Sequence, residues 1–95
     1  MFEWDEPKAT INFAKHNVTF DEAATVFGDD ESFDGLDRMH SRDEQRRLRV
    51  GRSSAGRIVF IAYTVRRSAY GETIRIISAR PANREEELGY VGTQD

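Results

Sequence analysis

The strongest constraint on the fold is a run of three strand-like segments that follow one another with only short turns between them. The segments are residues 46–50, 57–65 and 73–79, and the turns are residues 53–56 and 68–71. Because so short a turn can join only antiparallel neighbours, this order predicts an antiparallel meander. The middle segment is apolar at nearly every position, which predicts a central strand that is covered on both faces.

Two helices are predicted before these strands. Residues 6–16 have Asp5 in front of them as a cap and Asn17 behind them, and asparagine tolerates the left-handed conformation that ends helices. A second helix begins where Thr19 and Glu22 have the spacing of a capping box. An apolar stripe and a terminating glycine complete its pattern: Phe20, Ala23, Ala24, Phe27 and Gly28.

The remaining segments complete an α+β pattern. Residues 2–4 are predicted to form a brief strand or a packed arm, a short strand is predicted within residues 32–36, and Pro81 is predicted to open a last helix through Tyr90. We therefore expect two N-terminal helices, an antiparallel meander of three to four strands and a C-terminal helix. The 95 residues are expected to form a single domain, 1–95, with a disordered tail over residues 92–95.

Several classes of protein are excluded by what the sequence lacks. There is no cysteine, which excludes disulfides, thiol nucleophiles and thiolate metal sites. No signal peptide is evident and no apolar run approaches the roughly 20 residues of a membrane span, so we expect a cytoplasmic protein that does not engage a membrane. Residues 30–35 imitate half of a calcium loop, but Ser41 stands where a bidentate glutamate is needed. Since His16 and His40 are also far apart, we expect no metal and no cofactor.

Charge is distributed unevenly along the chain, although the net charge is only −3. Residues 1–44 carry four basic and twelve acidic side chains, whereas residues 45–95 carry ten arginines and five acidic side chains. Because a guanidinium group matches the geometry of phosphate oxygens, the second half predicts a surface that recognises phosphate or carboxylate groups. The alternative is a solvated, arginine-rich sheet face. The acidic half is expected to limit nonspecific binding of nucleic acid.

Three residues at the start of the first long strand could support acid–base chemistry on a phosphate ester. His40 and Glu44 lie four residues apart, and Arg46 shares a face with Glu44 if Glu44 begins the strand. A carboxylate here could take a proton from a 2′-hydroxyl while arginines stabilise the charge on the attacked phosphate. The competing interpretation is a surface ion pair between Glu44 and Arg46.

The arginines of the later strands are predicted to divide between two roles. Arg80 lies five positions after Arg75, an odd spacing, so in a regular strand the two side chains face opposite sides. One would then serve a site while the other pairs with acids, such as those of the last helix. Arg66 ends the central strand, where functional groups commonly lie. His16 is near a helix end and is expected to be a capping or core-edge residue.

A series of short motifs extends over residues 2–90. They are Phe2-Glu-Trp-Asp5, Lys8, Asn12, Lys15-His16, Val18-x-Phe20-x-Glu22-Ala23, Val26-Phe27, His40-Ser41, Glu44-x-Arg46, Gly51-x-Ser53, Gly56-Arg57, Tyr63-Thr-x-Arg66, Ile74-Arg-Ile-Ile-Ser-Ala-Arg80, Ala82, Glu86 or Glu87, and Tyr90. In these motifs the chain resembles the BrnT-type toxin family. It departs from the family at Asn17, where glycine is usual, and at residues 67–72, which form a longer turn than usual.

The resemblance implies a fold like that of RelE and ParE toxins and a ribonuclease toxin of a type II toxin–antitoxin system. It implies RNA cleavage by 2′-hydroxyl attack without a metal ion, and neutralisation by a BrnA-type antitoxin with a ribbon–helix–helix DNA-binding region. Operator DNA would be bound only through the antitoxin. Carried over by position, the candidate residues are Lys15, His16, His40, Glu44, Arg46, Arg66, Arg75 and Arg80.

The main functional hypothesis is therefore an endoribonuclease that inhibits translation. Its expected catalytic residues are His40, Glu44, Arg46, Arg66 and Arg80, and its expected RNA-binding residues are Lys15, Arg47, Arg49, Arg67 and Arg75. The alternative hypothesis is a non-catalytic, arginine-rich binding module that docks an acidic protein partner or nucleic acid. A third possibility, a gyrase-directed poison, predicts DNA damage instead of loss of mRNA.

Overall fold

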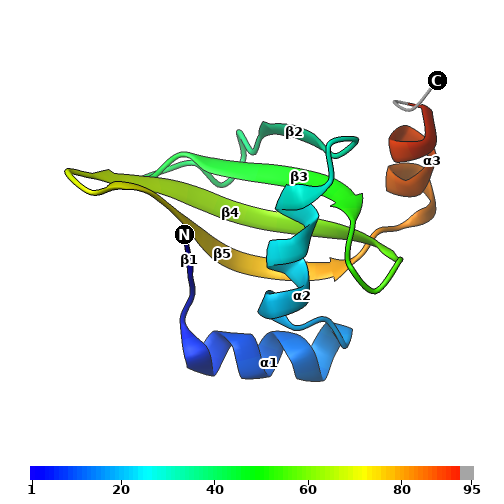
Figure 1. The fold of residues 1–95 in the computed structure, drawn as a ribbon, viewed down its shortest axis with the longest axis horizontal. Coiled ribbons are helices and arrows are strands. Elements are labelled where there is room, and N and C mark those ends of the chain that lie inside the picture. The colour runs from blue at the N-terminus through cyan, green and yellow to red at the C-terminus, as the bar shows by residue number, and fades with distance from the viewer. Residues whose placement is uncertain (93–95) are drawn as a thin grey trace.

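The computed structural model describes residues 1–92, which contain three α-helices, one 3-10 helix and five strands (Figure 1). In chain order the elements are β1 (Phe2–Glu3), α1 (Glu6–His16), α2 (Phe20–Thr25), η1 (Val26–Gly28), β2 (Phe33–Leu36), β3 (Arg46–Arg52), β4 (Ile58–Ser68), β5 (Gly71–Pro81) and α3 (Arg84–Gly92). The α+β class is confirmed, with helices before the meander and a helix after it.

The strands within residues 1–92 form one mixed, five-stranded sheet in the order β1-β5-β4-β3-β2. The strands from β2 to β5 are antiparallel neighbours, as the short turns predicted. β1 instead pairs in parallel with β5, with Phe2 beside Ile74 and Glu3 beside Arg75. The predicted antiparallel meander is therefore confirmed as the four strands β2 to β5, whereas the fifth strand and its parallel pairing were not predicted. A two-residue strand has too little alternation for its pairing to be visible in the sequence.

The local signals at the ends of the first two helices are largely confirmed. Asn17 adopts the left-handed conformation, with φ 57°, and ends α1. Asp5 occupies the N-cap position, although its side chain makes no capping hydrogen bond. Thr19 Oγ1 accepts a hydrogen bond from the Glu22 backbone N–H at 3.0 Å. The return bond of a capping box is not formed, because the Glu22 carboxylate accepts two hydrogen bonds from Arg57, at 2.6 and 2.8 Å.

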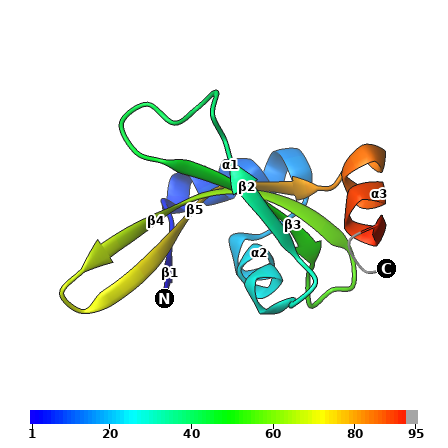
Figure 2. The same cartoon turned by 90° about the horizontal axis from the view of Figure 1, so that it is seen from above.

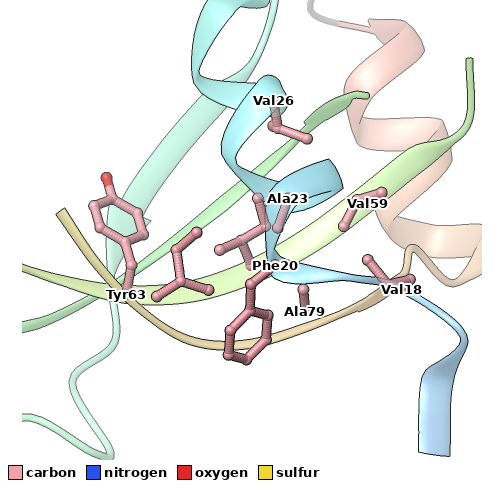
Figure 3. Close-up of a cluster of buried hydrophobic side chains, with 9 residues drawn as sticks. Val18, Phe20, Ala23, Val26, Val59, Tyr63 and Ala79 are labelled. Atoms are coloured by element: carbon pink, nitrogen blue, oxygen red, sulfur yellow. The ribbon is translucent and has the colours of Figure 1, made fainter. Parts of the chain in front are cut away.

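The hydrophobic core lies between one face of the sheet and the segment that contains α2 and η1 (Figures 1 and 2). Its fully or nearly fully buried members are Val18, Phe20, Ala23, Val26, Val59, Ile61, Tyr63, Ile76 and Ala79 (Figure 3). Burial of this apolar surface is the main favourable contribution to folding. It fixes which face of β4 and β5 is turned inward.

A buried asparagine attaches α1 to the edge of β5. The Asn12 side chain donates to the carbonyl oxygens of Ala79 and Val18, at 2.8 and 3.1 Å. Its Oδ1 accepts a hydrogen bond from the Ala79 N–H at 3.1 Å. Both backbone groups of Ala79 are thereby satisfied at an edge that the short β1 does not reach. α1 therefore completes the sheet edge instead of adding to the site described below.

The face of the sheet opposite the core, which we call the open face, is covered by α3 at one end only (Figure 1). The side chains of this face on β3 and β4 are Arg46, Leu48, Val50, Phe60, Ala62, Thr64 and Arg66. The α3 end lies against Val50 and Phe60 and leaves the region around Arg46 and Arg66 uncovered. β4 is nevertheless a central strand whose residues 58–65 are buried or half-buried on both faces, as predicted, and only its last residues, 66–68, are exposed.

A β-bulge in β5 changes the direction of its arginines. Ala62 is paired with Ser78 and Tyr63 with Ile76, so Ile77 is an extra residue without a pairing partner in β4. One extra residue reverses the alternation of side chains beyond it. Arg75 and Arg80 consequently both lie on the open face, and the prediction that they face opposite sides is wrong.

The C-terminal helix begins later than predicted. Pro81 is the last residue of β5, paired with Val59, and does not open the helix. Asn83 instead caps α3: its Oδ1 accepts from the Glu86 N–H at 2.8 Å, and its own N–H donates to Glu86 Oε1 at 2.9 Å. Of the tail expected over residues 92–95, Gly92 is the last residue of α3, and residues 93–95 lie outside the described part of the chain.

Candidate active site

A cleft of about 420 Å³ lies between the open face and the loop that joins β2 to β3. This loop stands away from the sheet (Figure 2). The lining residues are Met39, His40, Arg42, Asp43, Glu44, Arg46, Thr64 and Ile77. Three of the predicted catalytic residues, His40, Glu44 and Arg46, are thus brought together in one place.

The β2–β3 loop is held at its base by hydrogen bonds around Asp37 and Ser41. The Asp37 N–H donates to the Arg46 carbonyl oxygen at 2.8 Å, and the Arg46 N–H donates to Ser41 Oγ at 2.9 Å. Ser41 Oγ in turn donates to the Asp37 carbonyl oxygen at 2.5 Å. These bonds close the loop and place His40 and Glu44 above the first residue of β3.

His40 is oriented by the carboxylate of Asp37. Its Nδ1 lies 2.9 Å from Asp37 Oδ2, and its side chain is 62% exposed. Because an ionised carboxylate can only accept, a neutral His40 in this contact carries its proton on Nδ1 and keeps the lone pair of Nε2 free. A histidine held in this tautomer is suited to remove a proton from a substrate.

Glu44 forms an ion pair with Arg66 and not with Arg46. Arg66 Nε and Nη2 donate to the two carboxylate oxygens, at 3.0 and 3.3 Å. The interpretation of Glu44 and Arg46 as an ion pair is therefore wrong. Hydrogen bonding from Arg66, with a smaller contribution from the charge of Arg75, holds the pKa of Glu44 below its usual value. Glu44 is consequently a firmly ionised carboxylate and a weaker base than an unpaired glutamate.

A row of polar residues crosses the open face beside the cleft. Arg46 on β3 is paired in register with Thr64 on β4, Thr64 with Arg75 on β5, and Arg75 with Glu3 on β1. Arg75 Nη1 donates to Glu3 Oε2 at 2.7 Å, and Arg66 Nη1 lies 3.5 Å from the same oxygen. The charge of Arg75 is thus balanced by Glu3.

The guanidinium group of Arg46 stands apart from the other strand arginines. Among residues 1–92 it forms no hydrogen bond and no ion pair, although its backbone is anchored in the sheet. It is half-buried and lines the cleft. A permanently charged group in this position is available to an anionic ligand.

Arg80 is placed outside the cleft. It is paired with Phe60, four residues along β4 from Thr64, which corresponds to roughly 13 Å. Its guanidinium group lies 4.2 Å from the centroid of the Phe60 ring and donates to both oxygens of Glu86, at 2.8 and 2.9 Å. The expectation that one of the β5 arginines pairs with an acid of the last helix is confirmed by this contact.

The residues expected to bind RNA are scattered over the molecule. Lys15 lies in the last turn of α1, beside the far edge of the sheet, and Arg67 pairs with Glu72 at 3.0 Å on the projecting β4–β5 hairpin (Figure 1). Arg47 and Arg49 lie on the core side, where both contact Asp34, at 2.6 and 3.3 Å. Of this set, Arg75 alone lies in the row beside the cleft. An RNA-binding role for the set stays a prediction.

The two charged halves of the sequence are interleaved in the folded protein. Acids of the first half pair with arginines of the second half in each of the contacts Glu3–Arg75, Glu22–Arg57, Asp34–Arg47 and Glu44–Arg66. Asp34 belongs to the segment, residues 30–35, that imitates half of a calcium loop. Its carboxylate pairs with Arg47 and accepts a hydrogen bond from the Tyr63 hydroxyl. Much of the arginine-rich surface expected from the sequence is therefore already neutralised, which makes the unpaired Arg46 more distinctive.

Sequence reasoning missed several contributors to the cleft. Asp37 could have been found, because it precedes His40 by three residues and aspartate commonly bonds to nearby groups in turns. Glu3 depends on the parallel pairing of β1, and Ile77 depends on the bulge, so neither has a local signal. Thr64 appeared only as part of a strand pattern, and its position between two arginines is a consequence of register.

No metal centre is formed by the described residues, since none of their His, Asp or Glu side chains gather in groups of three or more that could hold an ion. None of the helices within residues 1–92 is long and apolar enough to cross a membrane.

Comparison with known proteins gives two findings. Residues 4–86 match the family described as the ribonuclease toxin, BrnT, of type II toxin–antitoxin systems. The fold is similar to the crystal structure of the Brucella abortus ribonuclease toxin BrnT, with a TM-score of 0.59 and 22% identity over 88% of this chain and 99% of that chain. At this identity the structural likeness supports the fold alone. No curated protein matches the sequence.

Proposed function

This chain belongs to the BrnT family of ribonuclease toxins of type II toxin–antitoxin systems, and we propose that it inhibits translation by cleaving RNA in the cytoplasm without a metal ion. The observation that carries the proposal is the cleft in which His40 and Glu44 lie beside Arg46, an arginine with no acidic partner among the described residues. A base and an unpaired cation in one cleft are the groups that phosphodiester cleavage by an internal nucleophile requires.

The proposed reaction uses the 2′-hydroxyl of the RNA as the nucleophile. His40 Nε2 removes its proton, the freed oxygen forms a bond to the adjacent phosphorus, and the bond from phosphorus to the 5′-oxygen breaks. The leaving oxygen takes up a proton from the imidazolium or from water. The products are a 2′,3′-cyclic phosphate and a 5′-hydroxyl, and Arg46 stabilises the charge that develops on the phosphorane.

The geometry favours His40 over Glu44 as the base. Asp37 leaves His40 Nε2 free, whereas the hydrogen bonds from Arg66 lower the pKa of Glu44 and weaken it as a base. We assign Glu44 the role of holding Arg66 beside the cleft as a second cation. Arg80, which is bound to Glu86, is assigned to the attachment of α3.

A matched pair of arginine variants tests the proposal. Purified protein is incubated with RNA in the presence of EDTA, and the ends of the products are identified. We expect cleavage by the wild type, a loss of about 10²–10³-fold in kcat for Arg46→Ala, and no comparable loss for Arg84→Ala. Arg84 is an exposed arginine of α3 without a partner in the described structure, so its removal changes the charge equally.

The variant His40→Ala should lose most of the cleavage activity, while Glu44→Gln should retain cleavage at a reduced rate. Absence of cleavage by the wild type, both with naked RNA and in a translating extract, would refute the enzymatic proposal. A tight complex with an acidic partner but no RNA products would then support the alternative of a non-catalytic, arginine-rich binding module.

We propose further that the partner is a BrnA-type antitoxin with a ribbon–helix–helix region, that operator DNA is bound only through this complex, and that the fold is of the RelE/ParE type. Membership of a type II family supports an antitoxin partner in general. Co-expression with the product of the adjacent open reading frame should relieve growth arrest and yield a stable complex. The isolated toxin should show no specific binding to operator DNA, whereas the complex should show it.

A further inference from the structure

The hydroxyl group of Thr64 is unusual because it is buried without a hydrogen-bond partner. Thr64 is 3% exposed, and its Oγ1 meets no donor or acceptor within the described structure. Buried polar groups are almost always hydrogen-bonded in folded proteins, so an exception calls for an explanation. A group left unsatisfied in the free protein is a candidate for contact with a ligand.

Thr64 also lines the cleft that contains His40 and Arg46. Rotation about its Cα–Cβ bond exchanges the methyl and hydroxyl groups between staggered positions, so the hydroxyl can turn toward the cleft that the residue already borders. The neighbouring lining residue on β5 is Ile77, the bulge residue, which has no polar side-chain atom to offer. Ile77 therefore does not compete with a ligand for this hydroxyl.

The neighbours of Thr64 define the chemistry of that ligand. Its register partners are Arg46 on one side and Arg75 on the other. Adjacent strands lie about 4.8 Å apart, which places the two arginine Cα atoms roughly 10 Å from each other with Thr64 midway. Arg46 is unpaired in the described structure, whereas Arg75 is held by Glu3. A hydroxyl donor between two guanidinium groups is suited to an oxyanion such as a phosphate group.

We propose that Thr64 is a substrate-contacting residue whose Oγ1–H donates a hydrogen bond to a non-bridging oxygen of the RNA phosphate held by Arg46. This inference rests on the proposed function, because it takes the cleft to be the place where RNA is bound. It adds an uncharged donor to a site otherwise made of charged groups. The contact also gives a reason for a threonine at position 64, where valine would fill the same volume.

The test compares Thr64→Val, which removes the hydroxyl at almost constant shape, with Thr64→Ser, which keeps it. We expect Thr64→Val to lower kcat/KM for RNA cleavage by about 10- to 100-fold, as for a lost hydrogen bond to a charged group. Thr64→Ser should stay within about threefold of the wild type. The urea midpoint of Thr64→Val should be unchanged or higher, because the hydroxyl has no partner in the free protein. Thr10→Val, on α1, is the control for the same chemical change.

Affinity for a 2′-O-methyl RNA, which cannot be cleaved, separates this inference from the proposed function. If the wild type binds that RNA without cleaving natural RNA, and Thr64→Val weakens the binding, the contact stands while the proposed reaction fails. If Thr64→Val cleaves natural RNA and binds the 2′-O-methyl RNA as well as the wild type does, the inference is overturned. So would a lowered urea midpoint that accounts for the lost activity, or a wild type that binds no RNA at all.

Discussion

Replacement of Arg80 by alanine separates a structural role from a catalytic one. The guanidinium group of Arg80 donates to both oxygens of Glu86, at 2.8 and 2.9 Å, and lies 4.2 Å from the centroid of the Phe60 ring. Glu86 also accepts a hydrogen bond from the Asn83 N–H at the start of α3. Arg80→Ala therefore removes the link between β5 and the first turn of α3.

The size of the effect follows from these contacts. Hydrogen bonds to charged groups contribute about 1.5–3 kcal/mol, and the lower half of this range applies because the Arg80 side chain is 35% exposed and that of Glu86 is 19% exposed. The cation–π contact adds about 0.5–1 kcal/mol. We expect Arg80→Ala to lower the free energy of unfolding by about 2–3 kcal/mol. Because Arg80 lies outside the cleft, kcat/KM of the folded variant should change by less than about threefold.

Urea denaturation followed by the fluorescence of Trp4, the single tryptophan, measures the stability. Trp4 packs edge-on against Phe20, with ring centroids 5.9 Å apart, so its signal reports on the core. Cleavage is measured at a temperature where both proteins are folded, with Arg84→Ala as the charge control. An Arg80→Ala variant with an unchanged urea midpoint and a loss of cleavage above 100-fold would refute this assignment and support the catalytic role expected from the family resemblance.

Two further predictions concern stability. Gly51→Ala should lower the free energy of unfolding by about 1–3 kcal/mol through overpacking, since a Cβ there would lie 2.6 Å from Ser32 Cβ. For the control Gly35→Ala, whose Cβ would meet no atom within 4 Å, the free energy of unfolding should stay within about 0.5 kcal/mol of the wild type in the same denaturation assay. Hydrogen bonds from Arg57 hold the pKa of Glu22 in the folded protein below its usual value. The pair therefore stabilises the protein fully at pH values above the ordinary glutamate pKa of about 4.3. This stabilisation is lost as the pH falls through the lowered pKa of the folded state. Glu22→Gln should therefore be less stable than wild type at pH 7 and approach it in acid; an equal deficit at every pH would contradict this cause.

The sequence predicted well those features that depend on neighbouring residues. The hairpin turns, the left-handed end of α1 at Asn17 and the first half of the capping box at Thr19 are all present. Each is decided by the conformational preferences of a few consecutive residues, which act before any tertiary contact forms. The pairing of β1 and the start of α3 after Pro81 were not predicted, because both depend on where β5 runs.

For the candidate site, the sequence identified His40, Glu44 and Arg46 as a group, and the structure places all three in one cleft. It could not identify their partners. Glu44 contacts Arg66, twenty-two residues away, instead of its neighbour in the sequence. The choice among many acids and many arginines is made by strand register and by the closure of the β2–β3 loop, neither of which leaves a local pattern.

The sequence by itself thus determined the class of fold, the strands that form the meander, and the residue types available for chemistry on a phosphate. Only the tertiary structure decided which arginines share a face, which of them are neutralised, and where Thr64 lies. The physical reason is that strand alternation has a period of two, so the single extra residue Ile77 moves Arg80 onto the same face as Arg75. Pairing partners, and therefore the absence of an acidic partner for the Arg46 guanidinium group within the described structure, are then fixed by contacts between residues far apart in the chain.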